Sequence, residues 1–199
     1  MQVRTQDAVS RREQILLATI EVVAEAGYHE ASFARIIEHA GLSSTRLISY
    51  HFESRDALMR EALGYVIEQG RAFMEPRIGR DGSARTRLAA YIRSNLEFLA
   101  ERPAYARAAV TILASLPEQP GEQEGADAAV TPLERMFTAA QQAGEMRRFD
   151  PTAMAVSLRA TIDAAAGRSV ARQADLRQYA EELVEIFDRA TATEVAPHD

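Results

Sequence analysis

A short polar stretch around residue 47 contains the side chains whose chemistry is best suited to binding. Leu47 and Ile48 are adjacent apolar residues, and their neighbours offer hydroxyl, guanidinium and imidazole groups. These neighbours are Ser44, Thr45, Arg46, Ser49, Tyr50 and His51. An arginine can pair with guanine through two hydrogen bonds, and hydroxyl groups bind phosphate oxygens. We therefore take this stretch as a candidate contact surface for DNA.

Three of these side chains each allow two interpretations. Arg46 either pairs with a guanine or stays on a phosphate or in solvent, because many protein–DNA contacts go to the backbone. Tyr50 is better suited to position a phosphate through its hydroxyl than to read a base. His51 either donates to a phosphate or packs beside Phe52. All three residues are candidates for DNA contact.

The polar stretch is expected to form the second of two short helices. Ser32 is suited to cap a first helix over Phe33–Ala40, which Gly41 then ends. The second helix is predicted over Ser44–His51. Two short helices with a glycine near the turn are typical of a helix-turn-helix, whose second helix enters the major groove. The apolar side of the second helix is expected to pack against Phe33, Ile36 and Ile37.

Two longer helices are predicted on either side of this element. The first spans Arg11–Glu25 and ends before Gly27, and the second spans Arg55–Glu75 after a Ser54 cap. Free backbone N–H groups are expected at the N-termini of the helices that begin near Ser32, Ser44 and Arg55. Such groups are suited to bind phosphates. Ser32 and Arg55 are therefore further candidates for DNA contact.

The run from Arg12 to Leu58 resembles the DNA-binding domain of the TetR family of transcriptional regulators. The resemblance depends on the motifs AEAGY, HAGLS and YHFESRDAL. In the family pattern, Tyr50 and His51 match DNA-facing positions. Arg55 matches a basic residue at the start of the long helix that contacts phosphate.

The resemblance implies an all-α fold with two domains. A helix-turn-helix DNA-binding domain would span residues 1–54, and a ligand-binding and dimerisation domain would span residues 55–199. The family also implies a homodimer formed through the last two helices, and a small-molecule effector whose binding releases the DNA. The sequence differs from the family pattern at Ile37, where a small residue is usual, and by one additional residue around Ser43–Ser44.

The second part of the chain is also predicted to be helical. Further helices are expected from a Ser83 cap to Glu101, Pro103 to Leu116, Thr131–Pro132 to Gly144, Asp150–Pro151 to Gly167 and Gln173 to Ala192. The segment Pro117–Asp127 contains two Pro and two Gly residues among acidic ones, which predicts a solvated loop. The whole chain then has about nine helices and no strand.

A polar residue marks a candidate effector site in the second domain. Asn95 lies on an otherwise apolar helix stripe with Tyr91 and Phe98. Its amide either orients a bound ligand or bonds a neighbouring backbone carbonyl. The candidate ligand-binding residues are Tyr91, Asn95, Phe98, Tyr105, Met136 and Phe137. Arg159 and Asp163 are i, i+4 partners, either as a surface pair or as a dimer contact.

The composition excludes several kinds of site. The chain has 199 residues, of which 47% are hydrophobic, and it has no cysteine. Disulfides, thiolate zinc sites and thiol redox chemistry are therefore excluded. The spacing of His29 and His39 does not suit a metal. We expect no metal, no cofactor, no signal peptide and no membrane span, and hence a cytoplasmic protein.

The charge distribution does not by itself indicate a nucleic-acid binder. The net charge is −6, and residues 1–60 contain seven Arg against eight Asp and Glu. All 23 basic residues are Arg and are spread along the chain, which is typical of genomic base composition rather than of a binding stripe. A few placed arginines still suffice for phosphate contacts.

The sequence and its resemblance to the TetR family therefore predict a ligand-responsive transcriptional regulator, with a repressor preferred and an activator left open. We expect it to bind double-stranded, palindromic operator DNA as a homodimer and to be released by a small hydrophobic or aromatic effector. No nucleophile, acid–base pair or phosphate-binding glycine loop indicates an enzyme. The alternative is a helical protein-interaction module that has lost DNA binding, which the net acidity favours.

Overall fold

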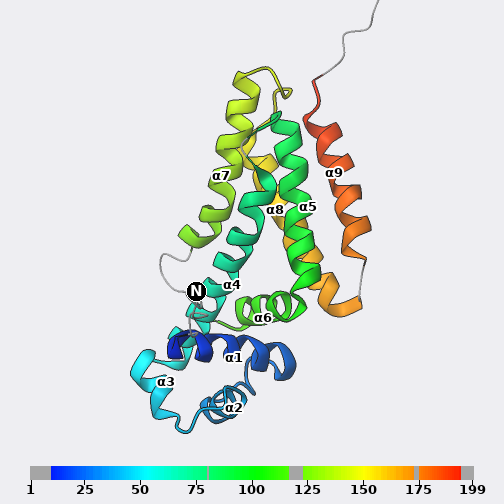
Figure 1. Cartoon of the computed structure of the whole chain (residues 1–199). Coiled ribbons are helices and arrows are strands. Elements are labelled where there is room, and N and C mark those ends of the chain that lie inside the picture. The colour runs from blue at the N-terminus through cyan, green and yellow to red at the C-terminus, as the bar shows by residue number, and fades with distance from the viewer. Residues whose placement is uncertain (1–9, 80, 117–122, 173–174, 194–199) are drawn as a thin grey trace, which may run out of the picture. The chain divides into compact units, whose positions relative to one another are not determined.

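The computed structural model describes residues 10–79, 81–116, 123–172 and 175–193. These residues form nine α-helices joined by turns, with no strand among them (Figure 1). The helices are α1 (Arg11–Ala26), α2 (Phe33–His39), α3 (Arg46–His51), α4 (Arg55–Ile78), α5 (Ala84–Glu101), α6 (Pro103–Ser115), α7 (Gln123–Gln142), α8 (Pro151–Arg172) and α9 (Leu176–Thr191). The predicted all-α fold is confirmed.

Side-chain caps explain where six of the described helices begin, among them α1, α2, α5 and α9. The Oγ atoms of Ser10, Ser32 and Ser83 each accept a hydrogen bond from the backbone N–H three residues later, at 3.1, 3.3 and 3.1 Å. The Asp175 carboxylate accepts hydrogen bonds from the backbone N–H groups of Arg177 and Gln178 at the start of α9, at 3.0 and 3.2 Å. Each bond satisfies an N–H group that has no partner within its helix. The predicted caps at Ser32, Ser54 and Ser83 are confirmed; the Ser54 Oγ atom accepts from the backbone N–H of Ala57 at 3.1 Å.

Two helix boundaries predicted at prolines are wrong. Helix α4 continues past Pro76, and α7 already begins at Gln123, so that Pro132 lies inside it. Proline lacks an amide hydrogen and therefore removes one i→i−4 bond, but the neighbouring bonds remain. After Pro76, the backbone N–H of Gly79 still donates to the carbonyl of Glu75 at 3.4 Å. These prolines therefore weaken the helices locally without ending them.

Three further predicted boundaries differ from the structure. Of the loop predicted over Pro117–Asp127, residues 117–122 lie outside the described residues, and residues 123–127 belong to α7. Helix α8 includes Gly167, because one glycine costs a helix only about 1 kcal/mol. Helix α9 begins at Leu176 after the Asp175 cap, and Gln173, the predicted start, lies outside the described residues.

The chain divides into two compact units. Unit 1 comprises Met1–Gln69 and Ala104–Leu116, and unit 2 comprises Gly70–Pro103 and Pro117–Asp199. Helix α4 contributes to both units. The predicted functional boundary between residues 54 and 55 falls inside unit 1, and it stays a prediction.

Unit 1 has an apolar core that holds the short helices in place. Its fully buried large side chains come from α1, α2, α3, α4 and α6, and they are Ile15, Ile20, Ile36, Ile48, Leu58, Met59 and Ile112. Burying one such side chain contributes about 1.5–3 kcal/mol. The core therefore fixes α2 and α3 although each is too short to be stable alone.

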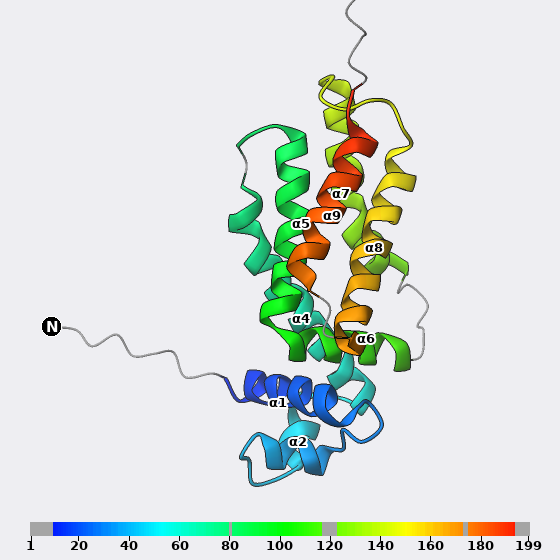
Figure 2. The ribbon, with the colours of Figure 1, turned by 90° about the vertical axis from the view of Figure 1, so that its right-hand side faces the viewer.

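Unit 2 is built from α5, α7, α8 and α9 with the end of α4. Helix α5 packs along α9 and α8, and α7 packs along α8; Figure 2 shows α5 and α9 side by side. The core between them includes Leu88, Ile92, Leu96, Phe137, Leu158, Ile162, Leu183 and Phe187. These positions recur at helical spacing, as the sequence predicts.

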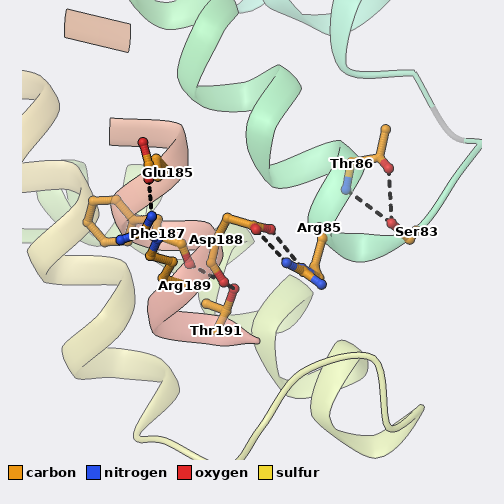
Figure 3. Close-up of polar contacts among 8 residues, drawn as sticks. All are labelled: Ser83, Arg85, Thr86, Glu185, Phe187, Asp188, Arg189 and Thr191. Atoms are coloured by element: carbon orange, nitrogen blue, oxygen red, sulfur yellow. Dashed lines mark hydrogen bonds and ion pairs between the residues drawn. The ribbon is translucent and has the colours of Figure 1, made fainter. Parts of the chain in front are cut away.

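Two ion pairs join α5 to α9 at the surface of unit 2. In Figure 3, the guanidinium of Arg85 donates two hydrogen bonds to the carboxylate of Asp188, with Nε 2.7 Å from Oδ1. Further along α5, Arg93 donates to both carboxylate oxygens of Glu181, at 2.8 and 2.7 Å. The later residue on α5 meets the earlier one on α9, so the two helices run antiparallel.

The Arg93–Glu181 pair is expected to make a small, pH-dependent contribution to stability. Hydrogen bonding and charge from Arg93 lower the pKa of the Glu181 carboxyl. A carboxyl whose folded-state pKa is lowered stabilises the fold above its unfolded pKa and loses this effect as the pH falls through the folded pKa. The side chains are 49% and 60% exposed, so solvent screens the pair and the contribution is about 0.5 kcal/mol or less.

Urea unfolding of the Glu181→Gln variant tests this expectation. At pH 7 the variant should be slightly less stable than the wild type, and the difference should shrink as the pH is lowered toward 3. Glu182→Gln is the matched control, because Glu182 has no ion-pair partner within the described part of the chain. A deficit of the same size from pH 7 to pH 3 contradicts the assignment.

Candidate nucleic-acid interface

The turn between α2 and α3 depends on Gly41. Its φ angle is +65°, in the left-handed region that glycine adopts without strain. The backbone N–H of Gly41 donates to the carbonyl of Glu38 at 3.0 Å, and that of Leu42 donates to the carbonyl of Ile37 at 2.9 Å. These bonds close the end of α2 and direct the chain into the turn.

Helix α3 begins later than predicted, at Arg46 instead of Ser44. The Oγ atom of Ser44 accepts a hydrogen bond from the backbone N–H of Arg46 at 3.2 Å, and Ser44 and Thr45 belong to the turn. A serine that accepts such a bond keeps its own O–H for donation. Ser32, which caps α2, is in the same situation. Both hydroxyls therefore remain able to donate to a phosphate.

Helix α3 has one buried side and one exposed side. Ile48 is fully buried, Leu47 is half-buried, and Phe52, directly after the helix, is 3% exposed. The Arg12 guanidinium lies 5.2 Å from the centre of the Phe52 ring and forms an ion pair with Glu61. These contacts anchor the end of α3 in unit 1, as its apolar pattern predicts.

The polar residues of α3 lie on the opposite side. Arg46, Ser49 and the preceding Thr45 are exposed, and Tyr50 has 80% of its surface exposed. His51 is half-buried, with its ring edge-to-face against Tyr50 at 4.9 Å. An exposed tyrosine whose ring is not packed in the apolar core is typical of a binding surface. The structure thus brings the predicted residues of α3 together on one accessible face, and their contacts with DNA stay a prediction.

Arg55 does not extend freely from the start of α4. Its guanidinium lies 4.2 Å from the centre of the Tyr28 ring and donates a hydrogen bond to the Tyr28 carbonyl. The Tyr28 hydroxyl in turn donates to the Asp56 carboxylate at 3.0 Å. Burial raises the pKa of the Tyr28 hydroxyl, and Asp56 raises it further. The turn after α1 is therefore joined to the first turn of α4.

Tyr28 is a residue of this region that the sequence analysis did not select. The motif AEAGY contains it, and the Arg55–Asp56 pair is also visible in the sequence. Tyr28 is separated along the chain by 27 positions from Arg55 and by 28 positions from Asp56. No local sequence pattern indicates a contact over such a separation.

The predicted ligand-binding residues fall into both units. Tyr105 belongs to unit 1, where its ring lies 6.5 Å from that of Tyr65. Tyr91, Asn95, Phe98, Met136 and Phe137 belong to unit 2. The structure therefore does not bring all six together within one unit.

The predicted ligand residues of unit 2 have partners within the fold. Asn95 is 7% exposed, and its Nδ2 donates to the carbonyl of Tyr91 at 2.8 Å, which is the backbone alternative. The Phe98 ring packs against Phe73, with the ring centres 5.5 Å apart. Phe137 is fully buried beside Phe149. A hollow of about 390 Å³ on this unit lies between α5 and α9, and none of the predicted residues lines it.

The Arg159–Asp163 pair is present on α8, and it reaches a second helix. Arg159 donates to the Asp163 carboxylate with Nε–O distances of 3.1 and 3.2 Å, and its Nη1 donates to the Tyr91 hydroxyl at 3.4 Å. The Arg159 side chain is only 26% exposed. Burial alone would lower the pKa of Arg159, but Asp163 and Tyr91 raise it. The pair therefore also links α8 to α5.

Two kinds of site are absent from the described part of the chain. Within residues 10–79, 81–116, 123–172 and 175–193, no three His, Asp or Glu side chains are grouped so as to hold a metal ion. None of the helices in these ranges combines the length and the apolar character that a membrane span requires.

Comparison with known sequences finds a matching family and several relatives. Residues 15–62 match the family described as "Bacterial regulatory proteins, tetR family". The HTH-type transcriptional regulators BetI of Klebsiella pneumoniae (strain 342) and Escherichia coli (strain K12 / DH10B) are each 32% identical over 112 residues. The match covers 55% of this chain and 57% of each relative, so the chain spans little more than half the length of these proteins.

Comparison with solved structures extends the likeness to most of the chain. A putative TetR-family transcriptional regulator from Rhodococcus sp. has a TM-score of 0.73 at 25% identity, covering 92% of this chain and 98% of that one. FadR from Bacillus subtilis, in complex with stearoyl-CoA, has a TM-score of 0.76 at 23% identity, covering 87% and 95%. AibR, in complex with isovaleryl coenzyme A and operator DNA, has a TM-score of 0.72 at 20% identity, covering 89% and 97%.

Proposed function

We propose that this chain is a transcriptional regulator of the tetR family, which residues 15–62 match, that it binds operator DNA through the exposed side of α3, and that a small molecule controls this binding. The observation that carries the proposal is the two-sided character of α3. Ile48 is fully buried while Tyr50 is 80% exposed, so the helix is anchored without using its polar groups. The proposed contact residues are Ser32, Ser44, Thr45, Arg46, Ser49, Tyr50, His51 and Arg55.

These residues divide into base-reading and phosphate-binding groups. Arg46 and Ser49 are exposed on the helix that enters the groove, and they are suited to base edges. The hydroxyl of Tyr50 and the guanidinium of Arg55 are suited to phosphates, which position the protein on the duplex. His51 is half-buried, so its role is to support Tyr50 or to donate to one phosphate.

The form that binds DNA is proposed to be a homodimer whose two subunits contact each other through α8 and α9. Val156 and Ala160 of α8 and Ile186 of α9 are exposed apolar residues, and small side chains allow helices to approach closely. A two-fold dimer places its two α3 helices about 34 Å apart, which is one turn of DNA. The operator is therefore proposed to be a palindrome.

The small molecule is proposed to be an apolar or aromatic effector that binds in residues 55–199 and releases the DNA, so that the protein is a repressor. Such an effector would favour the state whose α3 helices no longer fit the groove. The similar structures support an effector with an apolar part, because FadR was solved with stearoyl-CoA and AibR with isovaleryl coenzyme A, whose acyl chains are apolar.

Selection of duplexes from a random pool by the purified full-length chain tests this function. We expect enrichment of one inverted repeat whose half-sites are centred about 10 base pairs apart. In gel shifts with the enriched duplex, the logarithm of the association constant should fall linearly with the logarithm of the salt concentration. Failure to enrich any duplex would contradict the proposal and favour a protein-interaction module.

A further inference from the structure

The guanidinium of Arg55 is held by one neighbour, Tyr28, through two different contacts. One face of the guanidinium lies over the Tyr28 ring, 4.2 Å from its centre. One of its N–H groups donates to the Tyr28 backbone carbonyl. Arginine has five N–H donors, so this arrangement leaves most of its hydrogen-bonding edge for another acceptor.

Tyr28 is itself fixed by the rest of unit 1. It is 6% exposed, and its hydroxyl donates to the Asp56 carboxylate at 3.0 Å. Its carbonyl also accepts the backbone N–H of Ala31 at 3.4 Å, and its ring lies edge-to-face with His29 at 5.5 Å. The ring is therefore a rigid support on which the flexible Arg55 side chain rests.

We propose that Tyr28 is a positioning residue for DNA binding, which holds the Arg55 guanidinium in the orientation in which it binds a phosphate of the operator backbone. This inference rests on the proposed DNA-binding function. A free arginine loses much side-chain freedom when it binds a phosphate, whereas a guanidinium already held by a ring loses less. Tyr28 thereby makes the Arg55–phosphate contact stronger without touching the DNA.

The contact with Asp56 gives this arrangement a second consequence. Asp56 follows Arg55 on α4, and a bare carboxylate there would compete with the phosphate for the guanidinium. The Tyr28 hydroxyl occupies one oxygen of that carboxylate. Tyr28 therefore holds the arginine and at the same time engages the carboxylate of the adjacent residue, Asp56.

A double-mutant cycle on the enriched duplex tests the proposal. The wild type, Tyr28→Leu, Arg55→Gln and the double variant are compared by gel shift at several salt concentrations. Tyr28→Leu should weaken binding about 3- to 10-fold for each half-site and keep the salt slope, because Arg55 is still charged. Arg55→Gln should reduce the slope by about 0.9 for each phosphate contact that is lost. The double variant should bind no worse than Arg55→Gln.

Tyr65 provides the matched control for the cycle. Its hydroxyl donates to the Glu13 carboxylate at 3.0 Å, so Tyr65→Leu removes a comparable tyrosine–carboxylate bond from the same unit. Any loss of operator affinity caused by Tyr65→Leu should add to the loss of affinity caused by Arg55→Gln. If the loss from Tyr28→Leu is additive in the same way, Tyr28 only stabilises the fold and the proposal is overturned.

A second variant decides the question if Tyr28→Leu does not fold. Arg55→Lys keeps the charge but lacks the flat guanidinium that rests on the ring. We expect it to bind about 3- to 10-fold more weakly than the wild type with an unchanged salt slope. Wild-type affinity for Arg55→Lys or Arg55→Gln overturns the role of Tyr28 while the regulator function stands. If the wild type enriches no duplex, the function fails, and this inference fails with it.

Discussion

Replacing Arg46 with alanine is expected to weaken binding to the enriched operator by about 1–3 kcal/mol for each half-site, the value of one good arginine–guanine contact. Arg46 is exposed at the start of α3, and no carboxylate pairs with it in the described structure. Its guanidinium is therefore available to the major groove. The measurement is a gel-shift titration of the wild type and the variant on the same duplex.

The pattern of the loss separates the two interpretations of Arg46. If Arg46 reads a guanine, the variant should lose discrimination at one base pair of each half-site and keep its salt slope. If it binds a phosphate, the loss should be uniform across sequences and the slope should decrease. Tyr50→Phe should cost less, about 0.5–1.5 kcal/mol, because it removes one hydroxyl group.

Arg35→Ala is the matched control for Arg46→Ala. Arg35 is also an exposed arginine on a helix of unit 1, but its guanidinium pairs with Glu30 at 3.7 Å. It should change operator affinity much less than Arg46→Ala. Both substitutions are at the surface, so each should change the free energy of unfolding by no more than about 0.5 kcal/mol. Unchanged operator affinity in both Arg46→Ala and Tyr50→Phe would refute the assignment of α3 as the reading helix.

Replacing Phe137 with alanine should cause the largest loss of stability, about 3–5 kcal/mol in the free energy of unfolding. Phe137 is fully buried in the core of unit 2, and its ring lies edge-to-face with Phe149 at 5.4 Å. Truncation removes buried apolar surface and leaves a cavity that the surrounding helices only partly fill. Chemical denaturation followed by circular dichroism measures the effect.

Thr138→Ala provides the comparison for this experiment. Thr138 is the next residue of α7 and is exposed, so its truncation should change stability by less than about 0.5 kcal/mol. A similar loss in both variants would mean that α7 as a whole, rather than the Phe137 side chain, is sensitive to substitution. A stable Phe137→Ala protein would contradict the burial and leave a ligand-facing role for this residue.

Sequence reasoning succeeded where the cause of a structure lies within a few residues. Ser32 and Ser83 cap helices because their hydroxyls reach the N–H group three residues later. Gly41 forms the turn because it adopts a positive φ angle. The helix boundaries predicted at Pro76 and Pro132 were wrong. The loss of one backbone hydrogen bond at a proline does not by itself end a helix whose neighbouring bonds remain.

The sequence by itself determined the all-α fold, the two-sided character of α3 and the family resemblance of residues 12–58. These follow from periodicity, caps and turns, all of which act over one or two helical turns. Only the tertiary structure decided that Arg55 rests on Tyr28, that Tyr105 and Tyr91 belong to different units, and that Arg85 pairs with Asp188. The reason is that such contacts join residues far apart in the chain, and their geometry exists only once the helices have packed.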